Sequence, residues 1–124
     1  MYQKGLDSYR QTQVTSRTPL ELVVMLYDGV LGHLSVARDA IERKDIMARR
    51  DAMSRALAIL GELQNTLNVE HGGEIAAALD DLYTYATRRL MQAVVDNDVE
   101  PVDEVRRLLD GLRDSWRTIA TQQV

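Results

Sequence analysis

The chain has 124 residues, no cysteine and a formal net charge of −4 at pH 7. This length predicts a single domain with a real core, and a hydrophobic content of 45% argues against disorder. Without cysteine there are no disulfides, thiolate zinc sites or cysteine nucleophiles, and the acidic balance argues against general nucleic-acid or anionic-membrane binding. The first residues lack the apolar core of a signal peptide, and no apolar run is expected to cross a bilayer. We therefore expect a cytoplasmic protein without membrane insertion.

Residues 1–17 form a leading segment that differs in kind from the rest of the chain. It is polar, with isolated apolar residues that include Leu6 and Tyr9. These two residues are three positions apart, so a short helix would place them on one side. We expect a mobile N-terminal arm, or short helix, that docks through a few apolar contacts.

The first strong helix signal begins at Thr18. Thr18 can serve as the N-cap, Pro19 occupies the first helical position and Glu21 the third, which is a capping box with a proline start. The pattern runs to about Arg43. The following residues recur at helical spacing and predict one wide core stripe: Leu20, Val23, Val24, Tyr27, Val30, Leu31 and Leu34.

The same helix carries a second apolar side. Leu22, Met25 and Leu26 lie largely off the core stripe, and Gly29 and Gly32 add a nearly bare surface beside them. Such a side must be covered by the arm, by a second copy of the chain or by a client. Methionine adapts to varied partners, and each glycine weakens a helix by about 1 kcal/mol relative to alanine. These features favour binding, with close packing at the glycines.

Three further helices follow, over residues 46–67, 74–96 and 101–121, with a short tail at 122–124. Lys44-Asp45, the glycine-containing stretch 68–73 and the stretch 97–100 separate them. Four helices of similar length with short loops predict an all-α fold, an antiparallel up-down-up-down four-helix bundle. The expected inward residues are Ile46, Met53, Ala56, Leu57, Leu60, Leu63 and Leu67, then Ile75, Leu79, Leu82, Ala86, Leu90 and Ala93, then Val102, Val105, Leu109, Leu112, Trp116 and Ile119.

Residues suited to catalysis or metal binding do not converge anywhere in the sequence. The two histidines, His33 and His71, lack a second ligand at metal-site spacing. Gly72-Gly73 is followed by Glu74, which would repel a phosphate. We therefore expect no enzyme activity, no catalytic residue, no cofactor and no metal. Tyr83 and Tyr85 cannot both face inward on one helix, so one of them should reach the surface.

At this point the sequence resembles the FliS family of flagellar secretion chaperones, nearly end to end. The resemblance is carried by Tyr9, by TPLELVVMLYDG at residues 18–29, by GGEIA at residues 72–76, by Asn97-Asp98 and by Trp116-Arg117. The chain departs from the family in lacking the phenylalanine often found shortly after Gly29, and in carrying Gly32 and His33. These departures would alter the fit of a client and leave the fold unchanged.

The resemblance implies a bundle without catalytic activity whose client is the disordered C-terminal segment of flagellin. The chaperone would block premature polymerisation and present flagellin to the cytoplasmic domain of the type III export gate. By position, the resemblance places Leu6 and Tyr9 in an arm that covers a groove when the protein is free. It places Leu22, Met25, Leu26 and Gly29 in the groove or its floor. A bundle that self-associates through its first helix, as a weak homodimer, is the alternative.

Overall fold

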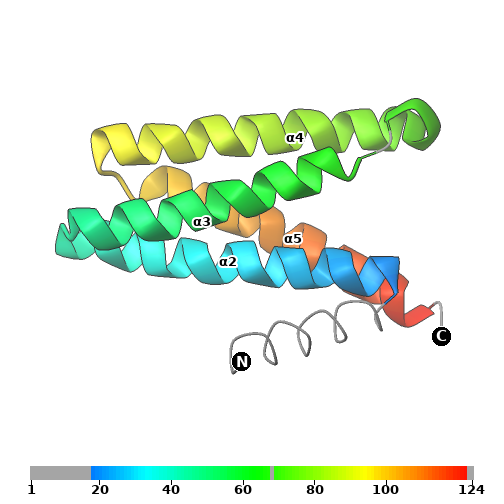
Figure 1. Cartoon of the computed structure of the whole chain (residues 1–124), viewed down its shortest axis with the longest axis horizontal. Coiled ribbons are helices and arrows are strands. Elements are labelled where there is room, and N and C mark those ends of the chain that lie inside the picture. The colour runs from blue at the N-terminus through cyan, green and yellow to red at the C-terminus, as the bar shows by residue number, and fades with distance from the viewer. Residues whose placement is uncertain (1–17, 68, 123–124) are drawn as a thin grey trace, which may run out of the picture.

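The structure is a computed structural model that describes residues 18–67 and 69–122, with the side chains of residues 69–71 left out. Every secondary-structure element in these two ranges is an α-helix (Figure 1). The all-α bundle expected from the sequence is confirmed, whereas Leu6 and Tyr9 lie outside the described residues. The helices are α2 (Pro19–Arg43), α3 (Ile46–Asn65), α4 (Val69–Asp96) and α5 (Glu100–Gln122).

Local signals fix the first two helices. The Thr18 hydroxyl accepts a hydrogen bond from the backbone N–H of Glu21 at 3.2 Å, which satisfies one of the free donors at the start of α2. α2 ends where Lys44 enters the left-handed region at φ 58°. Asp45 then begins α3 by accepting from the backbone N–H of Ala48 at 3.1 Å. The two-residue break between the helices forces α2 and α3 to run antiparallel.

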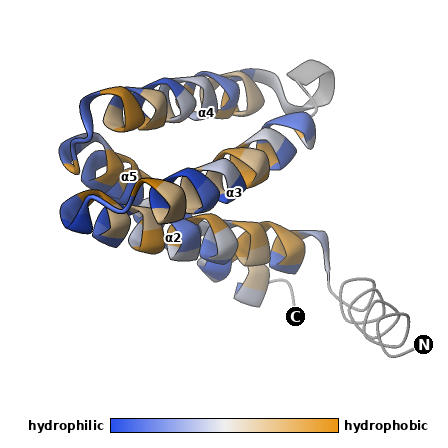
Figure 2. Cartoon of the chain, turned by 60° about the vertical axis from the view of Figure 1, so that its left-hand side comes forward, coloured by the Kyte–Doolittle hydropathy of each residue, from blue (hydrophilic) through white to orange (hydrophobic). Residues whose placement is uncertain are grey.

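α2 packs against both α3 and α5, and α4 closes the bundle by packing against the other sides of the same two helices. α2 and α4 are therefore diagonal partners (Figure 1). Each helix carries hydrophobic segments beside hydrophilic ones (Figure 2), as expected for amphipathic helices around one core. The largest fully buried side chains are Tyr27, Tyr83, Leu34, Leu60, Leu63, Leu90, Leu109, Val30, Val102 and Val105.

Four residues differ from the expected pattern. Leu26, placed on the second apolar side, packs against the buried core. Ile46, Ile75 and Ile119, all expected inward, are 58%, 74% and 41% exposed. Ile46 is the first residue of α3, and Ile75 lies in the part of α4 that extends past the end of α3 at Asn65. A side chain at the core-facing angle stays exposed where no neighbouring helix reaches it.

The glycine-containing stretch 68–73 also differs from the expected loop. The α4 helix already begins at Val69, and Gly73 interrupts it with φ 60° and ψ −138°. Glycine adopts this left-handed region without the steric clash that a Cβ atom would cause. The continuous part of α4 therefore starts just after Gly73.

α2 corrects the expectation that no apolar run could cross a bilayer. In length and composition it is the one helix among the described residues that could do so. The core helix of a soluble protein meets the same criteria. Here α2 supplies six residues to the buried core, and Arg38 on it forms an ion pair with Asp103 of α5 at 2.7 Å. The finding is therefore weak support for a membrane span.

Candidate partner-binding site on α2

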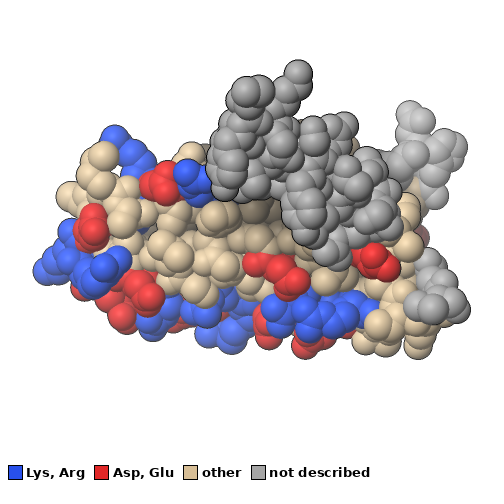
Figure 3. All heavy atoms as spheres, turned by 60° about the horizontal axis from the view of Figure 1, so that its bottom comes forward, with Lys and Arg blue, Asp and Glu red and all other residues tan. Residues whose placement is uncertain are grey.

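Five uncharged residues recur on the outward side of α2, three or four positions apart. We call them the α2 strip: Leu22, Met25, Gly29, Gly32 and Val36. This spacing keeps side chains on one face of a helix over several turns. Met25 is 38% exposed and Val36 is 51% exposed. Figure 3 shows uncharged surface across the middle of one face, with acidic and basic side chains along its lower edge.

Ion pairs between α2 and α5 border the strip on one side. Asp28 pairs with Arg113 at 3.3 Å and with Arg117 at 3.5 Å, and Arg38 pairs with Asp103 at 2.7 Å. Between these pairs lies an open cavity of about 520 Å³. Its α2 wall includes Gly32, where nothing lies within 4 Å of an added Cβ atom. This border is polar, so the apolar contact area available to a partner lies on the strip itself.

On its other side the strip meets α3 at Gly29. A Cβ atom on Gly29 would lie 3.1 Å from Ile59 Cδ1, so the glycine permits the close approach of α3 to α2. The sequence predicted that something packs closely against this glycine, and within the bundle that neighbour is α3. At Gly32 the space stays open.

The structure separates the predicted site residues of α2. Met25 is exposed and Leu22 is half-buried, so both are accessible on the strip. Leu26 packs against the core, and Gly29 lies at the contact with α3. Val36 belongs to the strip and was missed, although the spacing from Met25 through Gly29 and Gly32 continues to it.

The titratable groups whose pKa values shift belong to contacts between helices. Burial raises the pKa of the Tyr27 and Tyr83 phenols. On the surface, the hydrogen bond from Arg89 lowers the pKa of Glu104, and Tyr85 also donates to this carboxylate at 2.9 Å. Among the described residues there is no group of three or more His, Asp or Glu that could hold a metal ion. The arrangement is suited to holding helices together and to presenting an apolar face.

Comparison with known proteins identifies relatives over nearly the whole chain. Residues 1–123 match the model of the family described as flagellar protein FliS. The flagellar secretion chaperone FliS of Salmonella typhimurium is 38% identical over 121 residues, covering 94% of this chain and 90% of the relative. FliSB of Pseudomonas aeruginosa is 36% identical, covering 94% and 96%. FliS of Bacillus subtilis is 36% identical, covering 93% and 85%.

A solved structure described as a flagellar chaperone from bacteria has the same fold. The two chains superpose with a TM-score of 0.78 and share 16% sequence identity, with 98% of this chain and 99% of the other covered. At this identity the likeness concerns the fold alone.

Proposed function

Because the chain belongs to the FliS family of flagellar secretion chaperones, we propose that it binds the disordered C-terminal segment of flagellin in the cytoplasm. Binding prevents premature polymerisation and delivers the client to the flagellar type III export apparatus. The client-bound complex is then presented to the cytoplasmic domain of the export gate. In this role the protein is a chaperone and catalyses no reaction.

The observation that carries this proposal is the α2 strip. A disordered client becomes ordered only if it gains enough contact to offset the entropy that it loses. A client helix that lays its apolar face on the chaperone supplies that contact, and the strip offers a continuous row of uncharged residues along α2 for it. Met25 and Val36 offer exposed apolar side chains, and the open surface at Gly32 allows a client helix to approach the backbone closely.

The arm retains the role that the resemblance implied. We propose that Leu6 and Tyr9 cover part of the client face in the free protein and are displaced by client. Docking of the arm would lower the apparent client affinity by the undocked fraction and would limit self-association. Removal of residues 1–17 should therefore raise client affinity, self-association or both, as measured by calorimetry and sedimentation. A truncated protein with neither change would refute the switch.

Calorimetric titration with a peptide covering the C-terminal end of the same organism's flagellin tests the function. We expect 1:1 binding with a negative heat-capacity change, because apolar surface is buried. Met25→Glu should weaken binding by about tenfold or more, since a desolvated charge opposes burial. Leu26 is unsuitable for this test because its packing against the core would confound binding with stability.

Ile75→Glu is the matched control. Ile75 is a large apolar residue on α4 and is 74% exposed, so the same change adds a charge away from the strip. It should leave client affinity unchanged. Absence of binding by the folded wild-type protein would overturn the proposal. Self-association that is abolished by Met25→Glu would then support the alternative, a helical bundle that dimerises through α2.

A further inference from the structure

Another cavity borders the α2 strip, beside Met25 and beyond the ion pair of Asp28 with Arg117. It has a volume of about 220 Å³ and lies between the first turns of α2 and the last turns of α5. Its apolar lining comes from Val24 and Met25 on α2 and from Ala120 on α5. We call it the Ala120 cavity.

Ion pairs join the two helices that form the walls of this cavity. Asp28 pairs with Arg113 at 3.3 Å and with Arg117 at 3.5 Å, and Arg38 pairs with Asp103 at 2.7 Å. The start of α2 therefore lies beside the end of α5, and the two helices run antiparallel. Both walls are regular helix, so the cavity is present before any partner binds, as is usual for binding sites.

The size of the cavity suits a single side chain. An apolar cavity of about 150 Å³ is large enough to bind benzene, whereas sites for drug-sized ligands measure roughly 300–1,000 Å³. The Ala120 cavity, at about 220 Å³, lies between these values. Ala120 is half-buried in its wall, and its small side chain leaves the space open. One leucine, methionine or phenylalanine side chain would fill it.

The lining of the cavity favours an apolar occupant. Most residues that line the larger cavity beside Gly32 are charged, whereas the carboxylates at the Ala120 cavity are those of Glu21 and Asp28, which would repel an acidic side chain. Glu21 lies in the first turn of α2, where the helix dipole already stabilises its charge. The Thr121 hydroxyl already donates to the Thr118 carbonyl at 2.9 Å.

We propose that the Ala120 cavity holds one large apolar side chain of the flagellin segment, which anchors the client on the α2 strip. This inference rests on the proposed function. Met25 both lines the cavity and belongs to the strip, so a client helix that covers the strip passes the mouth of the cavity. Side chains that fill a preformed pocket contribute most of the binding energy of many interfaces. The client must then carry a large apolar residue at this one position.

Ala120→Leu tests the proposal by filling the cavity from the chaperone. Alanine and leucine are both strong helix formers, so the substitution should preserve α5. In calorimetric titration with the flagellin peptide, the affinity should fall by about tenfold or more, because the anchor side chain no longer has a pocket to fill.

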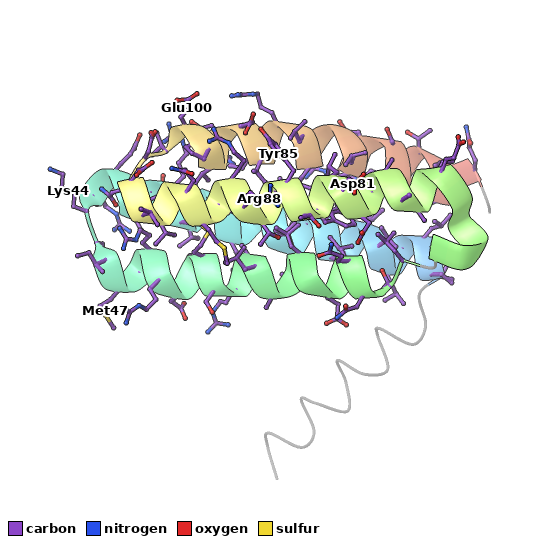
Figure 4. The ribbon with its side chains drawn as sticks, turned by 90° about the horizontal axis from the view of Figure 1, so that it is seen from above. Lys44, Met47, Asp81, Tyr85, Arg88 and Glu100 are labelled. Carbon is purple, nitrogen blue, oxygen red and sulfur yellow. The ribbon has the colours of Figure 1, made fainter. Side chains whose placement is uncertain are left out.

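Ala77→Leu is the matched control. Ala77 is an exposed alanine on α4, and α4 lies in the foreground of Figure 4 with α2 behind it. The same change therefore adds the same side chain away from the strip and the cavity. It should leave client affinity unchanged. Both variants should keep the circular dichroism spectrum and the cooperative thermal unfolding of wild type, which separates a filled cavity from a damaged fold.

Alanine substitutions in the peptide identify the anchor. Each large apolar residue of the peptide is replaced in turn, and each peptide is titrated into wild type and into Ala120→Leu. Replacing the anchor should weaken binding to wild type by about tenfold or more and should hardly change binding to Ala120→Leu, because contacting residues are coupled. Replacing any other residue should weaken binding to both proteins by the same factor.

Three outcomes would overturn the proposal while the wild-type protein still binds the peptide, so that the proposed function stands. The first is unchanged affinity of Ala120→Leu, and the second is the same loss with both proteins at every peptide position. The third is tighter binding by Ala120→Leu, which would show that the arm fills the cavity in the free protein. Absence of binding by the folded wild-type protein would instead overturn the function and this inference together.

Discussion

The hydroxyl groups of Tyr27 on α2 and Tyr83 on α4 lie 2.6 Å apart, within hydrogen-bonding distance. Both residues are buried, and their rings are tilted by 54° with centroids 6.5 Å apart. α2 and α4 are diagonal in the bundle, so this hydrogen bond passes through its interior. It fixes the position of α4 along α2, because a shift of one helical turn would break this hydrogen bond and leave both hydroxyl groups buried without a partner.

Replacement of one tyrosine should destabilise the bundle more than replacement of both. Tyr27→Phe or Tyr83→Phe leaves the other hydroxyl buried and unpaired, which costs about 1–3 kcal/mol. The double Phe variant removes both polar groups and keeps the ring volumes, so it should be more stable than the sum of the single changes predicts. Urea unfolding of the four proteins measures the coupling. Additive effects would contradict the pairing.

The buried tyrosines should also make the bundle unstable at alkaline pH. Burial raises the pKa of both phenols above the ordinary value of 10.0. Above about pH 10 the unfolded chain therefore loses phenolic protons that the folded chain keeps. The free energy of unfolding should then fall, by at most about 1.4 kcal/mol per pH unit for each tyrosine. The double Phe variant should show a smaller fall, and an equal fall would exclude these residues as the cause.

Glu104 should contribute a dependence of opposite sign at acidic pH. The hydrogen bond from Arg89, at 2.7 Å, is the main cause that lowers the pKa of this carboxyl below 4.5, and Tyr85 adds to it. The stabilisation is thus present at neutral pH and is lost as the pH falls through the lowered pKa. Wild type should be more stable than Glu104→Gln at pH 7, and the difference should shrink as the pH falls below 4.5. A constant difference in urea unfolding would contradict this.

The two glycines of the α2 strip should respond differently to alanine. Gly32→Ala should stabilise the protein by up to about 1 kcal/mol, because alanine favours the helix and nothing lies within 4 Å of the new Cβ atom. Gly29→Ala gains the same helix propensity, but its Cβ atom would lie 3.1 Å from Ile59 Cδ1. The Ile59 side chain must move, so the gain should be smaller. Thermal unfolding compares the two, and equal gains would show that α3 yields freely there.

Local signals in the sequence predicted the starts of α2 and α3 because these signals act within one turn. Thr18 and Asp45 cap α2 and α3 through their own neighbours three residues on. Whether a core-facing residue is buried depends on how far the neighbouring helices extend, and the wrong expectations for Ile46, Ile75 and Ile119 all concern residues near a helix end. The sequence restricted Tyr83 and Tyr85 to one inward residue. The contact with Tyr27 shows that it is Tyr83.

The candidate site, too, was predicted in part from the sequence. The sequence showed that α2 has more apolar residues than one core face needs, but it could not tell Leu26, which packs inward, from Met25, which faces out.

The sequence by itself determined the helical class, the starts of α2 and α3 and, through its resemblance, the family, because caps, periodicity and motifs lie within short stretches of chain. Only the tertiary structure decided which residues of α2 remain accessible, which glycine of α2 packs against α3 and which arginines form ion pairs. These properties depend on the distance between helices, and that distance is set by the packing of side chains from all four.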